Sequence, residues 1–402
     1  MLASSQHAAH PYAHWLADLS VPLLAIGDET APPTSTFAEV TLSSSWDAEE
    51  LVARALALHE SFGFDRVIGL GEVDIVPAAR IRERLDLMGQ REDSAWVYRD
   101  KLTMRREAAS KGLPVPAFAA ADAVDDVVDF IETHGAPVMV KPRMGVGALD
   151  IRRVDDPAEA AELSFLDEPD TYLVESFVDG PTFHVDALFL DGEIMVAVPC
   201  AYIGAGCISH WTDGGNGSYT LSPESPLAER LVAATARIAR SFPGPPDLAI
   251  HAEFFLYEDE ILLCEVASRG GGGTIPLTLR RRLGADIRQL WARAQCNLPI
   301  DWGGIHRQLE ATPLVAGFGL PRRNGQLLAL PDVAPPGVED LEFRASAGEH
   351  FSGTRYARRH SGDFVAAWTV SSDHEADLLN QVDATAAEME SLVVWSTAVP
   401  AR

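Results

Sequence analysis

The chain of 402 residues has few lysines and a large deficit of positive charge. Only Lys101, Lys111 and Lys141 are lysines among 32 Lys and Arg residues, so arginine supplies the other 29 cations. Each lysine therefore marks either a place that needs a compact ammonium group or a chance occurrence. The formal net charge of −27 excludes a protein that works mainly by binding a nucleic-acid backbone, because that activity requires a clustered cationic surface.

Cysteines and long apolar runs are also scarce. The four cysteines form no CxxC pair and no ligand-like group with histidine, which argues against a disulfide framework and a zinc site; they are Cys200, Cys207, Cys264 and Cys296. Residues 1–15 lack a basic segment followed by an apolar run, and roughly 18 consecutive apolar residues occur nowhere. We therefore expect no export signal, no membrane partner and a cytoplasmic location.

The first 95 residues alternate apolar runs with a helix-like stretch. Residues 21–28 and 64–74 are typical of buried strands, and between them Asp47 is a candidate cap for a helix that continues to Leu58. This β-α-β alternation predicts a parallel sheet with helices on its faces.

The rest of the chain mixes helices with antiparallel strands. Helices are expected at 96–111, 123–135, 227–242 and 373–389; strands are expected at 137–142, 171–178, 182–190, 193–203, 249–257 and 260–268. The strands at 171–178, 182–190 and 193–203 are predicted to form one antiparallel meander. A polar, glycine-rich stretch at 204–218 is too long for a simple hairpin and is a candidate functional loop. The fold class is α/β, with α+β character after the first domain.

Lys141 lies at the end of a short apolar strand and is followed by Gly145 and Gly147. This spacing places an ammonium group beside a backbone that can approach anionic oxygens closely, so phosphate is the natural ligand. A tight turn without any ligand is the alternative. The segment is not a Walker motif, because no GK[ST] follows the glycines.

Glu253 and Glu265 fall in two strands that a short acidic turn would fold back on each other. Their carboxylates would then lie side by side on one face of the hairpin. A divalent cation removes the repulsion between them, and Mg²⁺ bound by few carboxylates and by substrate phosphates is the usual solution. An alternating edge strand is the alternative interpretation.

Arg269 follows Glu265 and precedes four glycines, Gly270 to Gly273. A fixed guanidinium beside a flexible backbone suits the stabilisation of negative charge that develops on a phosphoryl or acyl group. The alternative is a structural ion pair with Glu265 or Asp186.

The order of these motifs resembles the ATP-grasp superfamily. The resemblance covers roughly residues 96–291 and is strongest to the carboxylate–amine ligases, such as the bacterial L-amino acid (dipeptide) ligases. It rests on five segments in order: 100–105 (DKLTMR), 140–148 (VKPRMGVGA), 175–186 (ESFVDGPTFHVD), 251–255 (HAEFF) and 265–271 (EVASRGG).

The resemblance implies an N-terminal α/β domain followed by an ATP-grasp fold. It suggests a first domain at 1–95, an ATP-grasp domain at 96–300 with a mobile lid subdomain at about 113–180, and an α+β C-terminal subdomain at 301–402. Members of the superfamily often form dimers, so the resemblance allows a homodimer, although the sequence itself does not determine the oligomeric state. The implied cofactors are ATP and Mg²⁺, with Mn²⁺ as an alternative.

The resemblance also implies a role for each matching residue. Lys101 and Lys141 resemble the lysines that contact the phosphates, and Gly145 and Gly147 resemble the loop that closes over them. The adenine-binding hinge corresponds to Glu175, Ser176, Phe177 and Val178. Glu253 and Glu265 resemble the metal ligands, while Arg269 and Lys141 are the candidate catalytic residues. Because Thr182 stands where a ribose-binding glutamate is often found, His184 is the first candidate for that role and Asp186 the second.

The chain departs from the family at Ala267, which stands where an asparagine usually helps to hold a metal. Either the two glutamates suffice together with water, or one of two metal sites is weakened.

Three functions follow from these observations. The first is an ATP-dependent ligase that joins the carboxylate of an amino acid to an amine through an acyl phosphate. The second is a ligase that activates bicarbonate or another substrate. The third, suggested by Ala267, is a protein that binds ATP without turnover. Both substrates of the first function are small molecules, and Arg280, Arg281 and Arg282 are candidates for binding a carboxylate or for a solvated helix face.

Overall fold

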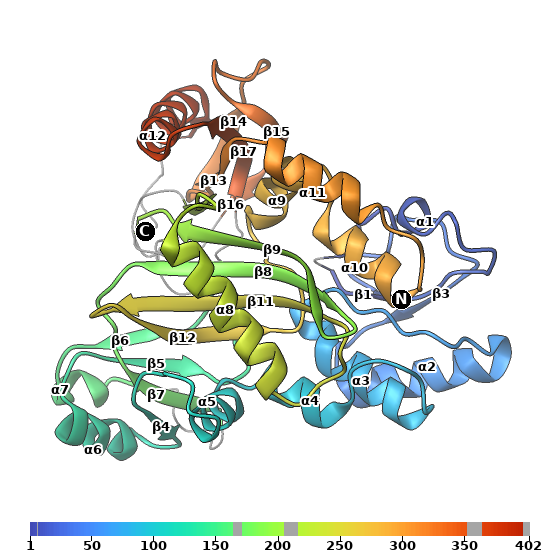
Figure 1. Cartoon of the computed structure of the whole chain (residues 1–402), viewed down its shortest axis with the longest axis horizontal. Coiled ribbons are helices and arrows are strands. Elements are labelled where there is room, and N and C mark those ends of the chain that lie inside the picture. The colour runs from blue at the N-terminus through green and yellow to red at the C-terminus, as the bar shows by residue number, and fades with distance from the viewer. Residues whose placement is uncertain (6, 164–170, 205–215, 352–363, 397–402) are drawn as a thin grey trace.

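The computed structural model describes residues 1–5, 7–163, 171–204, 216–351 and 364–396. Three small sheets and one large sheet, with helices packed around them, make up a mixed α/β fold of the predicted class. In Figure 1 the N-terminal part lies on the right, the four-stranded sheet at the lower left and the C-terminal strands at the top. In the described part of the chain, no helix is both long enough and apolar enough to cross a membrane.

The N-terminal part is a three-stranded parallel sheet with helices beside it. Its strands run in the order β1 (Leu2–Ala3), β2 (Leu24–Asp28) and β3 (Glu39–Ser43), and its helices are α1 (Tyr12–Trp15), α2 (Ala48–Phe62), η1 (Glu72–Asp74) and α3 (Ile75–Arg84). Helix α2 begins where the Asp47 carboxylate accepts hydrogen bonds from two backbone N–H groups, and it ends at Gly63 with a φ of +66°. The predicted strand at 21–28 and the predicted helix at 47–58 are confirmed.

The strand predicted at 64–74 is wrong. Residues 63–70 run beside β1, since the Leu2 N–H donates to the Ile68 carbonyl at 2.8 Å, but they form no strand. The Gly71 N–H donates to the Asp74 carboxylate at 2.9 Å, and this bond turns the end of the segment into η1. A local side-chain contact thus overrides the β-rich composition of the segment.

Two helices replace the single one predicted at 96–111. They are α4 (Glu92–Val97) and α5 (Lys101–Ser110). The break occurs because Asp100 caps α5, where its carboxylate accepts a hydrogen bond from the Thr103 N–H at 2.7 Å. The same carboxylate contacts Arg143 at 2.9 Å, so the start of α5 is tied to the loop that follows Lys141.

A four-stranded antiparallel sheet follows. Its order is β4 (Phe118–Ala121), β7 (Tyr172–Ser176), β5 (Val138–Pro142) and β6 (Arg152–Val154), and helices α6 (Val124–His134) and α7 (Pro157–Ala160) pack on it around a separate apolar core. The helix predicted at 123–135 and the strand predicted at 137–142 are confirmed. The predicted meander is wrong for residues 171–178, because this strand pairs with β4 and β5 rather than with the strand at 182–190.

The large sheet carries most of the predicted site. Its order is β12 (Glu260–Ala267), β11 (Leu248–Tyr257), β8 (Thr182–Leu190), β9 (Glu193–Tyr202), β10 (Asn216–Thr220), β13 (Leu314–Pro321), β17 (Phe364–Ser372) and β15 (Glu339–Phe343). Helix α8 (Pro226–Ser241) packs across β8, β9 and β11, as Figure 1 shows. The predicted β11–β12 hairpin and the predicted helix at 227–242 are confirmed.

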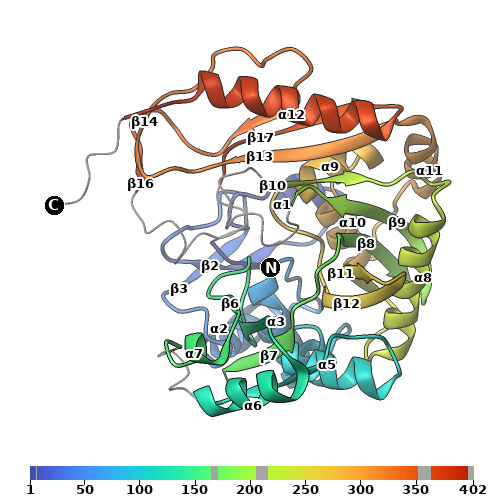
Figure 2. The same cartoon turned by 90° about the vertical axis from the view of Figure 1, so that its left-hand side faces the viewer.

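The C-terminal residues extend the large sheet. Helices α9 (Ile275–Leu283), α10 (Ile287–Gln295) and α11 (Trp302–Ala311) precede β13, and a small sheet of β16 (His350–Phe351), β14 (Gly325–Ala329) and β18 (Val394–Trp395) lies beside it. Helix α12 (Glu375–Leu392), expected at 373–389, packs along β13 and β17 (Figure 2). Strands β13 and β17 thus belong to the same sheet as β8 to β12. The domain boundaries expected at 95 and 300 stay predictions.

Candidate functional site

A cavity of about 1100 Å³ is lined by residues from the N-terminal part, the four-stranded sheet and both halves of the large sheet. Seven of the candidate residues line it: Lys101, Lys141, Gly145, Gly147, Glu253, Glu265 and Arg269. Segments separated by more than 160 residues of sequence therefore meet at one place.

Glu253 and Glu265 face each other directly across the β11–β12 hairpin. Both line the cavity, and the Glu265 carboxylate contacts the Lys101 ammonium at 2.8 Å. An irregularity in the strand pairing directly follows Glu253. Two partly accessible carboxylates at opposed positions of one hairpin are a donor set of hard oxygens that fits a magnesium ion.

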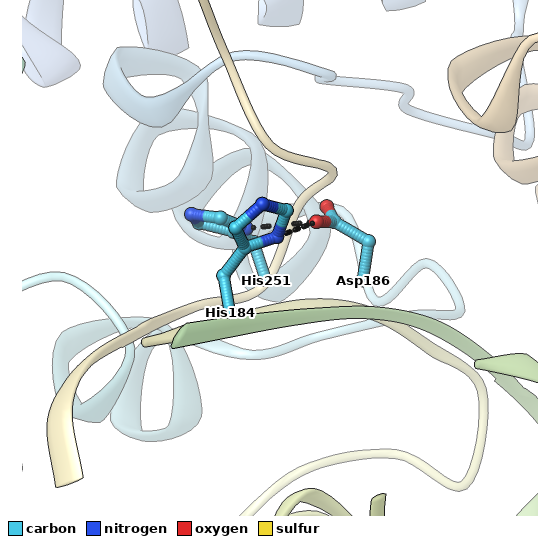
Figure 3. Close-up of side chains that lie close together, drawn as sticks. All are labelled: His184, Asp186 and His251. Carbon is cyan, nitrogen blue, oxygen red and sulfur yellow. Dashed lines mark hydrogen bonds and ion pairs between the residues drawn. The ribbon is translucent and has the colours of Figure 1, made fainter. Parts of the chain in front are cut away.

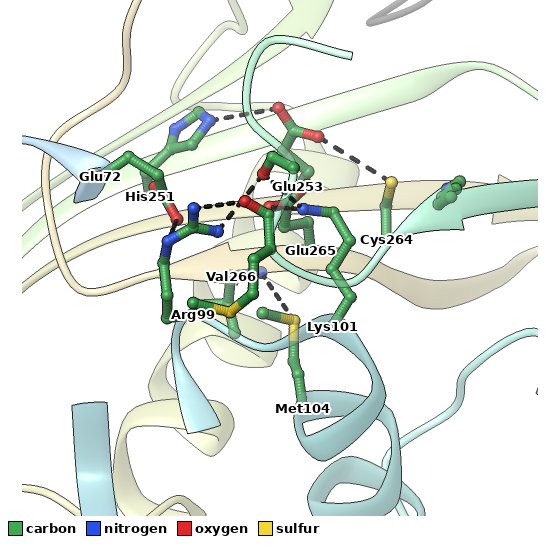
Figure 4. A network of polar contacts seen from close by, with 12 residues as sticks. Glu72, Arg99, Lys101, Met104, His251, Glu253, Cys264, Glu265 and Val266 are labelled. Carbon is green, nitrogen blue, oxygen red and sulfur yellow. Dashed lines mark hydrogen bonds and ion pairs between the residues drawn. The ribbon is translucent and has the colours of Figure 1, made fainter. Parts of the chain in front are cut away.

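Three neighbouring side chains contact the Glu253 carboxylate. The Tyr202 hydroxyl donates to it at 2.6 Å. His251 Nε2 lies 3.2 Å from it and the Cys264 thiol is 3.9 Å away, as Figure 4 shows for these two residues. Burial favours the neutral acid, but hydrogen bonds from His251 and Tyr202 and the charge of His251 lower the pKa of Glu253 to about 2. Glu253 is therefore ionised at neutral pH.

His184, Asp186 and His251 form a buried cluster beneath Glu253. Both imidazole Nδ1 atoms point to the same oxygen of Asp186, at 2.9 Å for His184 and 3.1 Å for His251 (Figure 3). Burial alone would lower the pKa of His251, yet the charge of Asp186 raises it to about 10, so His251 is a cation at neutral pH. The ligand atoms of the three residues lie within 4.8 Å of one another, which is compatible with a metal ion, but their hydrogen bonds already hold Asp186.

Lys141 reaches into the cavity from β5 and forms a short ion pair with Glu175 on β7. The other oxygen of Glu175 accepts a hydrogen bond from Arg105 of α5 at 2.8 Å. Burial favours the neutral acid, but Arg105 and Lys141 lower the pKa of Glu175 to about 2. Glu175 is only 1% exposed, so its carboxylate binds these two cations in the interior of the protein.

The hinge residues predicted to hold adenine lie outside the lining of the cavity. Ser176, Phe177 and Val178 are half-buried; the Phe177 N–H donates to the Pro137 carbonyl, and Arg153 lies 4.5 Å from the centre of the Phe177 ring. His184 is fully buried and does not line the cavity either.

The loop with Gly145 and Gly147 is tied to the start of α5. Lys101 Nζ donates to the Gly145 carbonyl at 3.1 Å, and the Arg99 guanidinium donates to the Met144 carbonyl. Gly147 has a φ of +56°, which a side chain would disfavour. The two lysines and the glycine loop thus enclose the same end of the cavity.

Arg269 is paired, but with neither of the acids expected from the sequence. Its Nε donates to the Glu72 carboxylate at 2.6 Å, and Arg99 approaches the other oxygen of Glu72 at 3.5 Å (Figure 4 shows Glu72 and Arg99). Although burial opposes ionisation, Arg269 and Arg99 lower the pKa of Glu72. The sequence assigned no role to Glu72 or Arg99, and the only signals were the glycines before Glu72 and the closeness of Arg99 to Lys101.

Ala267 is 1% exposed and packs in a small apolar cluster with Ile75, Val76, Ala79 and Ala95. The position that would carry an asparagine in relatives with the full motif therefore supports contact with α3 and α4. Ala267 also lines the cavity, so an amide added at this position would lie at the border between these aliphatic groups and the cavity.

The end of the cavity beyond Arg269 is lined by other residues. They include His7, His10 and Trp15 from the N-terminal part, and Arg280, Asp286, Arg288, Glu342 and Arg344 from the C-terminal part. Of the three consecutive arginines, only Arg280 lines the cavity; Arg281 pairs with Glu339 at 2.9 Å, and Arg282 donates to the Thr312 carbonyl. Most of the stretch at 204–218 lies outside the described residues, and so does Cys207.

No protein-family model matches the chain. The L-arginine-specific L-amino acid ligase of Bacillus subtilis is 26% identical over 293 residues, which span 66% of this chain and 64% of that enzyme. The matched segment thus spans less than two thirds of the length of this relative.

Solved structures give a more complete match. The L-amino acid ligase of Bacillus licheniformis matches with a TM-score of 0.78 and 18% identity over 98% of both chains. The biotin carboxylase domain of the 2-oxoglutarate carboxylase of Hydrogenobacter thermophilus, in complex with MgADP, ADP and bicarbonate, matches with a TM-score of 0.66 and 14% identity over 96% of this chain and 87% of that one. The chain therefore has the ATP-grasp fold, and its resemblance to the ATP-grasp carboxylate–amine ligases is confirmed.

Proposed function

We propose that the chain is an ATP-dependent ligase that joins the carboxylate of an amino acid to an amine and releases ADP and phosphate. One observation carries this proposal: two lysines, two opposed carboxylates and one arginine line a single cavity of about 1100 Å³. The likeness to L-amino acid ligases in sequence and in fold supports it.

The reaction proceeds by two substitutions. An oxygen of the substrate carboxylate bonds to the γ-phosphorus of ATP as the bond to the ADP oxygen breaks, which gives an acyl phosphate and ADP. The amine nitrogen then bonds to the acyl carbon, phosphate leaves with the electron pair of its C–O bond, and the nitrogen loses a proton. Carboxylates resist direct attack because oxide is a poor leaving group, and phosphate is a good one.

The residues of the chain supply positive charge and enclosure. Lys101, Lys141 and Arg269 are placed to neutralise charge on the phosphates and on the acyl group. Glu253 and Glu265 would hold Mg²⁺, which would supply positive charge against the negative charge of the phosphates. The loop with Gly145 and Gly147 would exclude water from the acyl phosphate.

The structure refines the proposed role of the hinge. Because Glu175 is buried between Lys141 and Arg105, we assign it the positioning of Lys141 rather than direct contact with adenine. Phe177 and Val178, with Ser176, remain our candidates for the adenine edge. The ribose role of His184 stays a prediction from the sequence, because its side chain is fully buried against Asp186.

A phosphate-release screen of all pairs of amino acids with ATP and Mg²⁺ tests the proposal. We expect release only when a carboxylate donor and an amine acceptor are both present. Release with bicarbonate, or without any amino acid, would instead favour the second function, which the fold likeness to the biotin carboxylase domain supports. Binding of ATP with no release in any mixture would favour a non-catalytic ATP-binding protein.

Two broader expectations accompany this function. We propose that the enzyme acts in the cytoplasm, in keeping with small-molecule substrates. We also propose a homodimer, which light scattering of the purified protein would test.

A further inference from the structure

The part of the cavity wall beyond Arg269 carries more cations than anions. Arg280, Arg288 and Arg344 line it, against Asp286 and Glu342. In a chain with a net charge of −27, a local excess of cations inside a cavity requires an explanation.

Arg344 is the least neutralised of these cations. Its guanidinium donates to the Gly273 carbonyl at 3.1 Å, and its nearest described carboxylate is Glu342, at 3.8 Å. Glu342 lies closer to Arg280, at 2.7 Å, and so divides its charge between two arginines. Burial lowers the pKa of Arg344, and the neighbouring cations Arg288, Arg280 and Arg322 lower it further, although Glu342 opposes them.

Arg288 stands at the other end of the same glycine run. Its Nε and Nη2 donate to the two oxygens of the Asp286 carboxylate, at 2.8 and 2.5 Å, which leaves Nη1, 3.5 Å from His10 Nε2, on the side away from Asp286. The aliphatic stem of Arg288 passes beside Gly270, where a Cβ would meet its Cγ at 3.9 Å. Burial, with Arg288 nearby, lowers the pKa of His10 to about 4, so this imidazole is neutral and adds no competing charge.

Of the glycines between the two arginines, Gly272 leaves its backbone open to the cavity, whereas a Cβ on Gly271 would meet Ile275 at 2.8 Å. A Cβ built on Gly272 would meet no atom within 4 Å, and the Gly271 N–H is fixed by a 2.6 Å bond to Asp186. The run begins directly after Arg269, which the proposed function places at the reacting acyl group. A group bound by Arg288 and Arg344 would therefore lie a short distance from the new amide bond.

We propose that Arg344 and Arg288 form a subsite for a substrate carboxylate that is not the one activated. A guanidinium binds a carboxylate through paired hydrogen bonds, and a second guanidinium adds charge. The inference rests on the proposed function and narrows its substrate class: one of the two substrates carries a free carboxylate. That group is the α-carboxylate of an amino-acid acceptor or a second carboxylate of the donor.

The test compares substrates that differ only in this charge. For a substrate pair found in the phosphate-release screen, KM is measured for the acceptor amino acid and for its carboxamide, with wild type, Arg344→Gln and Arg288→Gln. We expect KM for the acid to rise about 10- to 100-fold in both variants, corresponding to about 1.4 to 2.8 kcal/mol, and KM for the amide to stay unchanged. Arg281→Gln, one residue from Arg280 but outside the cavity, is the matched control.

A second comparison identifies the source of the carboxylate. Succinate and its monoamide, succinamate, are used as donors with the same acceptor. A KM increase confined to succinate assigns the subsite to the donor, and an increase confined to the acceptor acid assigns it to the acceptor. Equal losses for acid and amide, or no loss in either comparison, would overturn the proposal.

A measurement without turnover separates this inference from the proposed function. In the presence of saturating Mg²⁺ and ADP, succinate should raise the melting temperature of wild type and of Arg281→Gln but not that of Arg344→Gln. Arg344→Lys, which keeps the charge, should recover part of the shift and shows that the site has folded. If no mixture releases phosphate, the proposed function fails, while this shift still decides whether the subsite exists.

Discussion

At the scale of single residues, lysine usage is the most informative feature. Lys101 and Lys141 line the same cavity although 40 positions separate them, and each contacts a carboxylate. Lys111 is outside it, half exposed and 3.4 Å from Glu107 on the same helix. Two of three lysines at one cavity, in a chain that otherwise uses arginine, fit a need for compact ammonium groups.

Lys141→Ala should weaken ATP binding about 30- to 150-fold, because one charge-assisted contact to a phosphate contributes roughly 2–3 kcal/mol. Lys111→Ala should change the Kd less than twofold. Titration calorimetry with a non-hydrolysable ATP analogue and Mg²⁺ measures both. Similar losses in the two variants would show that Lys141 does not contact the phosphates of ATP.

Glu265→Gln should remove turnover that depends on Mg²⁺ while the protein stays folded, since the amide is a poorer ligand for a hard cation and the residue is not fully buried. Glu260→Gln, at the exposed turn end of the same strand, should keep full activity. Phosphate release against Mg²⁺ concentration, with circular dichroism as a check on folding, distinguishes the two. A Glu265→Gln protein that unfolds would instead indicate a structural ion pair with Lys101.

At the scale of elements, one buried carboxylate joins three of them. Glu175 on β7 contacts Lys141 on β5 and Arg105 on α5, and all three side chains are at least nine-tenths buried. Removing the central charge leaves two cations without their shared partner, which typically costs about 3–5 kcal/mol. The four-stranded sheet and α5 therefore depend on each other through this contact.

Glu175→Gln should change how stability depends on pH. The pKa of Glu175 is lowered from 4.5 to about 2 in the folded protein, so its stabilisation is complete above pH 4.5 and is lost as the pH falls toward 2. The variant should be less stable at neutral pH and should lose about 3 kcal/mol less than wild type between pH 4.5 and 2.

Urea denaturation at several pH values measures this difference, with the more exposed Glu107→Gln on α5 as the control. Parallel pH curves for wild type and Glu175→Gln would show that the ion pairs do not stabilise the fold.

At the scale of the whole molecule, the cavity exists only because distant parts meet. Glu72 comes from the N-terminal part, Gly145 from the four-stranded sheet, Glu265 from the large sheet and Arg344 from its C-terminal extension. A ligand that binds at this junction stabilises all the parts at once, because it binds the folded state alone.

Mg²⁺ and ATP together should therefore raise the melting temperature by several degrees. At 100 times the Kd the expected stabilisation is about 2.7 kcal/mol. Differential scanning fluorimetry should show the shift for wild type and Lys111→Ala, and little of it for Lys141→Ala. An unchanged melting temperature in wild type would contradict a nucleotide site at the junction of these parts.

The sequence by itself determined the local features. The apolar runs around Glu253 and Glu265, joined by a short acidic turn, predicted the hairpin that sets the two carboxylates on one face, where the structure has them opposite each other. The two ends of α2 are equally local features, since Asp47 caps its start and Gly63 follows its last residue. These features depend on residues a few positions apart, and the chain order of such motifs suggested the ATP-grasp fold.

Only the tertiary structure decided which charges meet. Glu72 and Arg269 are 197 positions apart, and no local pattern marks their contact. The same holds for Arg344 beside Gly273, and for Glu175, whose carboxylate is buried between two cations rather than exposed to a ligand. Propensity and periodicity act over one or two turns of chain, whereas these contacts arise from the packing of whole sheets against each other.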